Sequence, residues 1–401
     1  MSSLRNFFVR QGKGLEVVAS GYVESTLTQH DGKRPSEGAE GLVRCFLYEV
    51  RNFMPSYVWA FLIAAVAAVV LTPFVIKFAF RTGALDAPDA RKVHKKPIPR
   101  IGGLAIYAAF MISMGLLLET AEIPEEMAQG VTGLVVGGSM IVALGLWDDY
   151  VSLPARVKLL GQIVCAWAAV AFGVRIDFIT SFSGEITYLY DYVTIPLTIF
   201  WMVGITNTVN LIDGLDGLAA GVATIASLTI CLVALRMDIL VVAIVTAALA
   251  GSAFGFLFYN FNPAKIFMGD TGSMFLGFML SGISVVGVIK SAAVVALVVP
   301  VLALGLPIMD TTFAIVRRWL AGAPIMKPDK GHLHHRLLRM GYSQRQAVLL
   351  MYVFSALLGS AAIAMTAVSP RLAILILVLM IVAVLYGAKR LGILTMKKAT
   401  R

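Results

Sequence analysis

The chain has 401 residues, of which 59% are hydrophobic and only 14% charged, whereas an ordinary soluble domain carries about 25% charged residues. Apolar stretches long enough to cross about 30 Å of hydrocarbon recur along it. These features exclude a soluble enzyme and predict a polytopic membrane protein. The net charge of +10 does not indicate nucleic-acid binding, because no basic soluble domain carries it, and the three scattered cysteines form no disulfide or metal-binding pattern.

The first 53 residues are polar and do not fit this membrane pattern. They would have to be exported ahead of the first span, yet they show no signal-peptide pattern. We therefore expect Met54 to be the natural start, with residues 1–53 a disordered extension or a mis-assigned start. Residues 54–390 would then form the transmembrane domain, and residues 391–401 a basic cytoplasmic tail.

Hydropathy predicts an all-α bundle of about eleven transmembrane helices. The expected spans are 56–79, 102–118, 130–147, 157–174, 192–209, 217–235, 238–258, 273–290, 292–315, 346–367 and 371–387. Segment 175–190, between the fourth and fifth spans, is expected to form a small external hairpin.

Lysine and arginine are concentrated in the loops after the first and ninth spans and in the C-terminal tail. Because loops rich in these residues stay in the cytoplasm, the N-terminus of the first span should lie outside and the C-terminus inside. This orientation places every aspartate-bearing loop described below on the cytoplasmic side.

Two adjacent acids, Asp148 and Asp149, end the third span. The C-terminal end of a helix is already negative, so two carboxylates at this position require a compensating cation. The pair indicates either metal or proton chemistry on a phosphate, or simply a solvated loop that begins with two acids.

Four polar residues before the sixth span, Asn207, Asn210, Asp213 and Asp216, are spaced three apart. On a helix they would share one side. Two carboxamides and two carboxylates in this register suit a sugar nucleotide or a hydrated cation. The alternative, a capped helix start, accounts for only one of the acids.

The segment Met268–Ser273 immediately precedes the eighth span. A helix N-terminus with exposed amides is an anion site, and Asp270 beside it could hold Mg²⁺, which typically takes one or two carboxylates plus substrate phosphates. The alternative is that Asp270 is an ordinary N-cap.

Histidines gather in the long basic loop after the ninth span, as His332, His334 and His335, followed by Arg336. Imidazole and guanidinium groups together suit a diphosphate, and the otherwise basic surroundings disfavour zinc. A basic amphipathic helix on anionic lipid is an alternative that is compatible with this interpretation.

Two further features are weaker candidates. The basic segment Arg91–Gly103 could present Lys95, Lys96 and Arg100 to a lipid phosphate, or could serve only as the signal that orients the first spans. Asp310 is ionisable and lies inside the ninth span, where neighbouring arginines could pair with it.

Taken in order, five segments resemble the polyprenyl-phosphate N-acetylhexosamine-1-phosphate transferase family: Arg91–Gly103, Asp148-Asp149, Asn207–Gly217, Met268–Ser273 and His332–Arg336. The resemblance runs from about Met54 to the C-terminus. The His-x-His-His-Arg form is similar to the bacterial branch that uses UDP-N-acetylglucosamine, whereas the peptidoglycan branch usually shows consecutive histidines. Two features depart from the pattern, namely Asp89, where Asn is often found, and the N-terminal extension.

The resemblance implies an Mg²⁺-dependent enzyme, with Mn²⁺ as a substitute, that transfers N-acetylglucosamine 1-phosphate from UDP-N-acetylglucosamine to undecaprenyl phosphate and releases UMP. This would be the initiating step of a cell-envelope polysaccharide, catalysed by a multi-pass protein of the bacterial inner membrane, for which a dimer is usual among relatives. By resemblance, Asp148, Asp149 and Asp270 are catalytic, and Asp270 and Asp149 hold the metal. The substrates would be bound by Lys95, Lys96, Asn207, Asn210, Asp213, Asp216, His332, His334, His335 and Arg336.

Other functions stay open at this point. Within the family, the donor could be the muramoyl-pentapeptide nucleotide or another UDP-N-acetylhexosamine. Outside it, an ion-coupled transporter or a lipid flippase would use the acids as ion ligands, but such carboxylates are expected near the bilayer midplane. A lipid-binding scaffold without catalysis would not need acids suited to Mg²⁺ in three loops.

Overall fold

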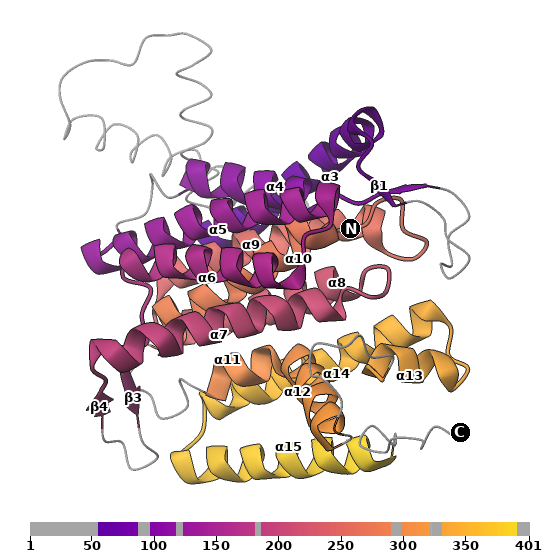
Figure 1. The fold of residues 1–401 in the computed structure, drawn as a ribbon. Coiled ribbons are helices and arrows are strands. Elements are labelled where there is room, and N and C mark those ends of the chain that lie inside the picture. Colours follow the sequence, from indigo (N-terminus) through magenta and orange to yellow (C-terminus); the bar gives the residue numbers. More distant parts are fainter. Residues whose placement is uncertain are drawn as a thin grey trace, which may run out of the picture. The chain divides into compact units, whose positions relative to one another are not determined.

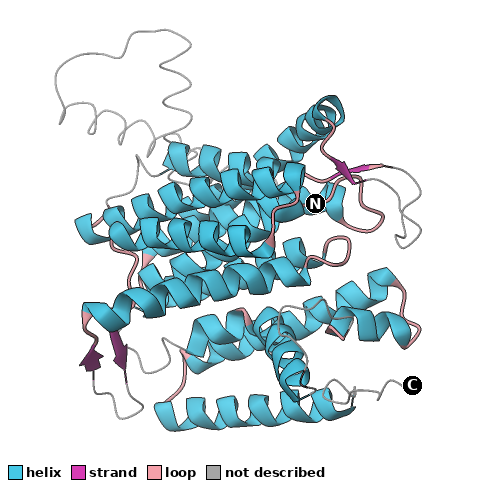
Figure 2. Cartoon of the chain, in the orientation of Figure 1, coloured by secondary structure: helices cyan, strands magenta, loops and turns pink. Residues whose placement is uncertain are grey.

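The computed structural model describes residues 55–86, 97–117, 123–180, 186–289, 298–320, 322 and 331–390, most of them in helices (Figure 2). Eight of the described helices are long and apolar enough to cross a membrane. The prediction of a helical, multi-pass membrane protein is therefore confirmed. The predictions for residues 1–53 and 391–401 lie outside the described residues.

Most of the described helices lie side by side in a bundle (Figure 1). In chain order they are α3 (Ser56–Thr82), α4 (Gly103–Leu117), α5 (Glu125–Val151), α6 (Ala155–Ala171), α7 (Asp191–Ile212), α8 (Leu218–Arg236), α9 (Leu240–Asn260), α10 (Gly269–Ile283), the π-helical η2 (Ser284–Ile289), α11 (Val298–Ala303), α12 (Gly305–Leu320), α13 (Leu333–Arg339), α14 (Gln344–Met365) and α15 (Pro370–Arg390). Each expected span overlaps one or two of these helices, although the number that cross the membrane stays a prediction.

The ninth expected span, residues 292–315, is not one continuous helix where the structure describes it. The chain forms the short α11, changes direction after Leu304, and continues as α12, which is steeply inclined to its neighbours (Figure 1). Pro307 lies in the first turn of α12, where a missing backbone N–H leaves no hydrogen bond unmade. Apolar composition alone cannot reveal such a break, because both halves are hydrophobic.

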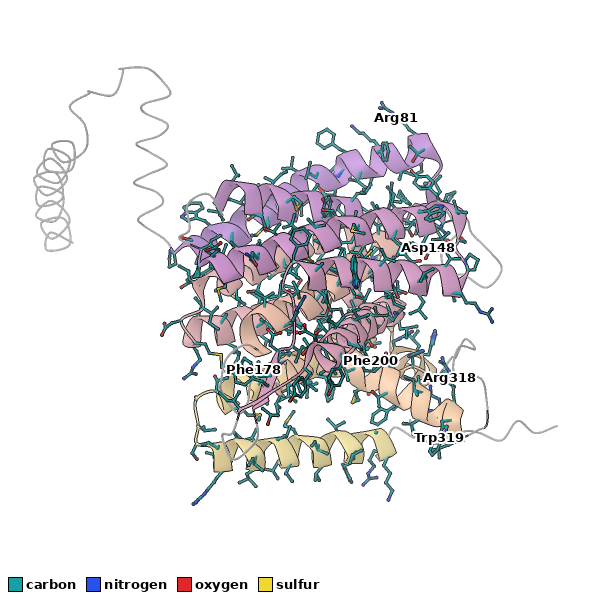
Figure 3. All side chains as sticks on the ribbon, turned by 60° about the vertical axis from the view of Figure 1, so that its left-hand side comes forward. Arg81, Asp148, Phe178, Phe200, Arg318 and Trp319 are labelled. Atoms are coloured by element: carbon teal, nitrogen blue, oxygen red, sulfur yellow. The ribbon has the colours of Figure 1, made fainter. Side chains whose placement is uncertain are left out.

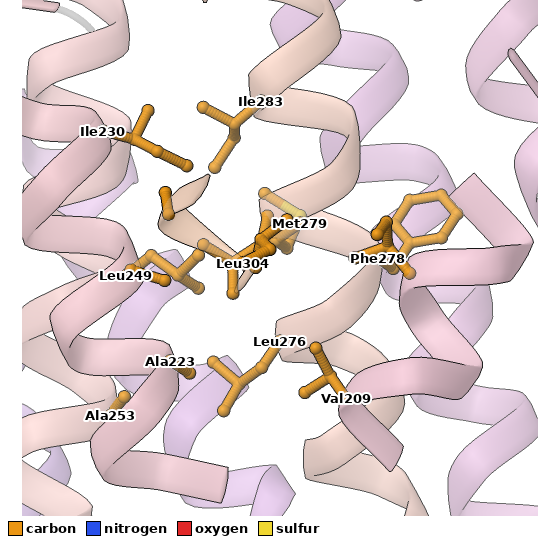
Figure 4. Close-up of a cluster of buried hydrophobic side chains, with 14 of the residues drawn as sticks. Val209, Ala223, Ile230, Leu249, Ala253, Leu276, Phe278, Met279, Ile283 and Leu304 are labelled. Carbon is orange, nitrogen blue, oxygen red and sulfur yellow. The ribbon is translucent and has the colours of Figure 1, made fainter. Parts of the chain in front are cut away.

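The most enclosed helix is α10, whose residues from Thr271 to Ile283 are all buried. A helix that is apolar on every side belongs in the interior of a bundle. Figure 4 shows side chains of α10 packed among those of α7, α8 and α9. The labelled residues are Val209, Ala223, Ile230, Leu249, Ala253, Leu276, Phe278, Met279, Ile283 and Leu304. The helix that carries Asp270 is therefore fixed by packing along its whole length.

Small residues let α4 and α5 approach the backbone of α10 closely. Gly103 of α4 lies against Gly272, and a Cβ atom on Gly145 of α5 would be only 2.6 Å from the Cα atom of Thr271. Such small-residue contacts are a general way for membrane helices to pack. The contact at Gly145 brings the end of α5, with its two acids, against the start of α10.

Two short pairs of strands interrupt the helices: β1 (Leu85–Asp86) with β2 (Ile98–Pro99), and β3 (Phe178–Thr180) with β4 (Ile186–Tyr188). Both pairs are antiparallel, and the second confirms the hairpin expected within residues 175–190. Figure 3 shows Phe178 of this hairpin and Asp148 toward opposite ends of the helical bundle. The end that carries Asp148 is called the site end below.

The close contact between α5 and α10 predicts a stability difference between two glycine substitutions. Gly145→Ala places a methyl group against the backbone of Thr271, which cannot move aside as a flexible side chain would. We expect it to destabilise the protein by about 1–3 kcal/mol, seen as a lower thermal midpoint in detergent. Gly115→Ala in α4 is the control, since nothing lies within 4 Å of its Cβ position. Equal midpoints for the two variants would contradict the packing described here.

Candidate active site

A lysine joins two of the predicted catalytic aspartates. Lys158 Nζ, in the first turn of α6, lies 2.9 Å from Asp148 Oδ2 and 3.0 Å from Asp270 Oδ1, and donates to Asn210 Oδ1 at 3.4 Å. This ammonium is a cation of the kind that two acids at the negative end of α5 require. Lys158 was not among the site residues predicted from the sequence. Lys158 and Gln162 are four residues apart, and this spacing predicts that their side chains lie on the same face of a helix.

The carboxylate of Asp149 caps the start of α10. Asp149 Oδ1 accepts the backbone N–H of Asp270 at 3.0 Å, and Oδ2 accepts both the N–H of Thr271 at 3.0 Å and its hydroxyl at 2.6 Å. The anion site expected at this helix N-terminus thus binds a side chain of α5. Asp270 itself is not the N-cap, because α10 begins at Gly269.

Arg100 secures the same junction from the loop before α4. Its guanidinium donates to the backbone carbonyl oxygens of Asp149 and, at 3.4 Å, of Asp148. These carbonyls belong to the last turn of α5, where a cation is favourable. Gly269 has a φ of +71°, and a Cβ atom there would lie 2.6 Å from Asp149 Oδ2. The turn before α10 therefore depends on a residue without a side chain.

The two asparagines of α7 both face α6. Asn210 donates to Asp270 Oδ1 and, at 2.8 Å, to Ser273 Oγ. One turn deeper, Asn207 exchanges two hydrogen bonds with Gln162, of 2.6 and 3.2 Å. The amide of Asn207 is thus engaged in joining two helices. Its predicted contact with a nucleotide stays a prediction.

The two acids that follow these asparagines are not on the same helix. Because α7 ends at Ile212, the prediction that all four polar residues share one helix face was wrong for Asp213 and Asp216. Asp216 Oδ2 accepts Asn262 Nδ2 at 2.9 Å and the N–H of Ala264 at 3.1 Å. These bonds tie the loop between α7 and α8 to the loop after α9.

Asp213 differs from the other acids in this region. Within the part of the chain that the structure describes, its half-buried carboxylate has no hydrogen bond or ion pair. Burial, and then the negative charges of Asp270, Asp149 and Asp216, raise the pKa of Asp213 to about 7. A carboxylate held near other acids without a partner is a natural ligand for a cation.

The histidine segment contacts the loop between α7 and α8 through His334. His332 and His334 are buried, and their rings are nearly parallel with centroids 5.8 Å apart. A Cβ atom on Gly214 would be 2.7 Å from His334 Nε2, so this ring lies against the aspartate loop. Burial, and then the neighbouring His335, lower the pKa of His334 to about 4, so the ring is neutral at physiological pH.

The remaining predicted residues fall into two groups. His335 and Arg336 lie in α13, half-buried, and Arg336 Nε donates to the carbonyl of Gly331 at 3.2 Å. Lys95 and Lys96 lie outside the described residues, so their predicted contact with a lipid phosphate stays a prediction.

The donor set of the site suits a hard divalent cation. The site has four carboxylates, those of Asp148, Asp149, Asp213 and Asp270. Of the two basic side chains here, Lys158 binds Asp148 and Asp270, and Arg100 binds backbone carbonyl oxygens. Among the residues that the structure describes, no three His, Cys, Asp or Glu side chains form a ready-made metal cage. Mg²⁺ does not need one, since it usually takes one or two carboxylates and completes its shell with phosphate oxygens and water.

Together, the fold and the site define a multi-pass membrane protein that gathers acids, amides and histidines at one end of a helical bundle. A family model described as glycosyl transferase family 4 matches residues 131–288. The chain is 40% identical over 341 residues to a probable undecaprenyl-phosphate N-acetylglucosaminyl 1-phosphate transferase of Bacillus subtilis, covering 84% of this chain and 93% of the relative. The chain therefore belongs to glycosyl transferase family 4, as the resemblance predicted, and is an enzyme.

Two other relatives show the breadth of this family. A decaprenyl-phosphate N-acetylglucosaminephosphotransferase of Mycolicibacterium smegmatis is 40% identical over 316 residues, which cover 73% of this chain and 78% of the relative. A phospho-N-acetylmuramoyl-pentapeptide-transferase of Desulforudis audaxviator is 32% identical over 328 residues, which cover 75% of this chain and 94% of the relative. Asp148, Asp149, Lys158, Asp213 and Asp270 lie within residues 131–288, which the family model matches.

The capping bonds predict that Asp149 contributes to stability. Asp149→Asn replaces an acceptor oxygen by an amide nitrogen, so at least one of the three donors at the start of α10 loses its partner. We expect a loss of about 1–3 kcal/mol, measured as a lower thermal midpoint in detergent. Asp270→Asn keeps an oxygen for Lys158 and Asn210 and should melt within a degree or so of the wild type. A wild-type midpoint for Asp149→Asn would disprove the capping role.

Proposed function

We propose that the chain transfers N-acetylglucosamine 1-phosphate from UDP-N-acetylglucosamine to a polyprenyl phosphate, with undecaprenyl phosphate as the bacterial acceptor. An oxygen of the lipid phosphate attacks the β-phosphorus of the donor, the bond to the α-phosphate oxygen breaks, and UMP leaves. The observation that carries the proposal is the meeting of Asp148, Lys158 and Asp270 at 3.0 Å or less, from three separate helices. The names of the two relatives at 40% identity support it.

We assign the Mg²⁺ site to Asp270 and Asp213. Asp270 lies at the start of α10. The carboxylate of Asp213, which has no hydrogen-bond or ion-pair partner among the described residues, interacts electrostatically with Asp270. Bound there, the ion would reduce the repulsion between two anionic substrates and stabilise charge on the phosphoryl group being transferred. The predicted participation of Asp149 is possible only through lone pairs that α10 does not use.

The chain's own residues have distinct roles in this proposal. Asp148, held by Lys158 and by the N–H of Leu153 at 2.6 Å, accepts a proton from the lipid phosphate or orients it. Asp149 acts through α10, by keeping Asp270 in place. His332, His334, His335 and Arg336 bind the diphosphate and sugar, and Asn210 supports Asp270 while the α7–α8 loop faces the nucleotide.

The location of the site supports a cytoplasmic reaction at the inner membrane of a bacterium. Figure 3 shows the basic residues Arg81 and Arg318 at the site end, with Asp148, and positively charged ends of membrane helices stay in the cytoplasm. A site at the end of the bundle also favours an enzyme over a transporter or flippase, whose ligands are expected at mid-depth. We also propose that the lipid product initiates a polysaccharide and that the enzyme is a homodimer.

A second donor is supported by one comparison. The relative from Desulforudis audaxviator is named for a muramoyl-pentapeptide substrate and shares 32% of aligned residues. The higher identity of 40% to the N-acetylglucosamine relatives and the His332–Arg336 pattern make UDP-N-acetylglucosamine the first choice.

One assay tests the proposed function directly. Purified protein in detergent or nanodiscs is given undecaprenyl phosphate, Mg²⁺ and either UDP-N-acetylglucosamine or the muramoyl-pentapeptide nucleotide, and UMP and lipid products are measured. We expect product with the first donor, at least about a hundredfold less with the second, and none after EDTA. Product only with the second donor would reverse the choice, and none with either would refute the proposal.

The proposed role of Asp270 predicts a large loss of activity without a loss of fold. Asp270→Asn removes a metal-binding charge but keeps an oxygen for Lys158 and Asn210. We expect kcat/KM to fall by about a thousandfold or more, with an unchanged elution profile. Asp191→Asn is the control, because this acid is 81% exposed and lies at the other end of α7. Wild-type turnover in Asp270→Asn would refute the assigned role.

A further inference from the structure

One carboxylate outside the cluster of aspartates is as buried as a core leucine. Asp310 lies in α12 with only 2% of its surface exposed, about two turns before Arg318, which marks the site end in Figure 3. A buried charge in a membrane protein is expensive, and such residues are usually paired and functional. Its partners therefore indicate what it does.

Both oxygens of Asp310 are bound to the start of the histidine segment. Asp310 Oδ2 lies 2.9 Å from His332 Nδ1, and Oδ1 accepts the backbone N–H of Leu333 at 2.8 Å. His332 is the N-cap residue of α13, and its own side chain makes no capping bond. The cap is supplied instead by Asp310, from a different helix.

The pairing also fixes which ring nitrogen of His332 is available. A carboxylate accepts hydrogen bonds, so Nδ1 of His332 carries the proton that faces Asp310, and Nε2 is the nitrogen left for a ligand. From the sequence, neighbouring arginines could have been the partners of Asp310. The structure places His332 and the start of α13 there.

The ring of His334 connects His332 to the loop between α7 and α8. His332 and His334 are stacked with an angle of 8° between their planes, and His334 Nε2 lies against Gly214, next to Asp213. Both rings are buried, so neither can turn without displacing its neighbours. A chain of direct contacts thus runs from Asp310 to the loop between α7 and α8.

We propose that Asp310 is a positioning residue, which orients His332 and His334 toward the diphosphate of the nucleotide-sugar donor. This inference rests on the proposed function, because it assigns the histidines to the donor. Asp310 does not touch substrate; it acts through His332. Its loss should weaken the use of the donor and leave the lipid phosphate unaffected, whereas a purely structural cap would lower the amount of active enzyme and change neither KM.

The test compares four variants of the full-length protein in the UMP-release assay. Asp310→Asn keeps an oxygen for Leu333 but turns an amide toward His332, and His332→Gln leaves the carboxylate and its cap in place. We expect each to raise the donor KM by about tenfold or more, with the KM for undecaprenyl phosphate within about twofold of wild type. The double variant should be no worse than the poorer single variant, since both changes remove one interaction.

Thr311→Val on the same helix is the matched control. The hydroxyl of Thr311 is buried and has no hydrogen-bond partner among the described residues, so its removal should leave both KM values unchanged. Multiplicative effects in the double variant, an unchanged donor KM, or an equal rise in both KM values would overturn the proposal. If Asp310→Asn fails to fold, the donor KM of His332→Gln alone decides.

The same experiment separates this inference from the proposed function. No UMP from the wild-type protein with either donor would refute the function. Normal turnover of the wild type together with a normal donor KM for Asp310→Asn and His332→Gln would refute only the positioning role.

Discussion

The site depends on one contact between a side chain and a helix end, the carboxylate of Asp149 on the first amides of α10. A negative group is favourable there because the helix N-terminus carries partial positive charge. The contact requires α5 and α10 to touch at backbone level, which Gly145 permits. Once it forms, Asp270 lies in the first turn of α10, within 3.0 Å of Lys158. By capping α10, Asp149 thus places the preceding residue, Asp148, close to Asp270, to which we assign the metal.

The sequence was sufficient to predict the helices and the convergence of the acids. Hydropathy predicts the spans because segments that cross lipid must be largely apolar. The uneven distribution of lysine and arginine predicts that the loops with Asp148, Asp213 and Asp270 lie on one side of the membrane. What it could not predict were contacts between helices. The pairing of Asn207 with Gln162 and of Asp310 with His332 depends on which helices become neighbours, and the end of α7 at Ile212 separates residues that a continuous helix would have aligned. The break after Leu304 was hidden because the residues on both sides of it are apolar.

Acids that are alike in sequence have different tasks in the fold. Asp149 and Asp216 use their oxygens to bind backbone amides and an asparagine, so they hold α10 and the α7–α8 loop. Asp213 has no such partner among the described residues, and burial, followed by neighbouring negative charge, raises its pKa to about 7. A fold that only needed stability would pair or remove this carboxylate. Its retention is understandable where a cation and phosphorylated substrates provide the missing partners, since functional sites keep groups that the fold alone would not favour.

The depth of the polar groups agrees with the two substrates that we propose. A polyprenyl phosphate has its chain in the hydrocarbon and its phosphate at the interface, while a nucleotide sugar comes from water, so their meeting place must lie at the ends of the spans. Polar side chains just below that level must then be fully paired. Gln162 and Asn207 satisfy each other one turn beneath Lys158 and Asn210, and Asp310 is paired with His332 and Leu333. These bonds give the amides of Gln162 and Asn207 and the carboxylate of Asp310 polar partners below the interface. The same bonds that make these side chains compatible with the membrane therefore also set the geometry of the site.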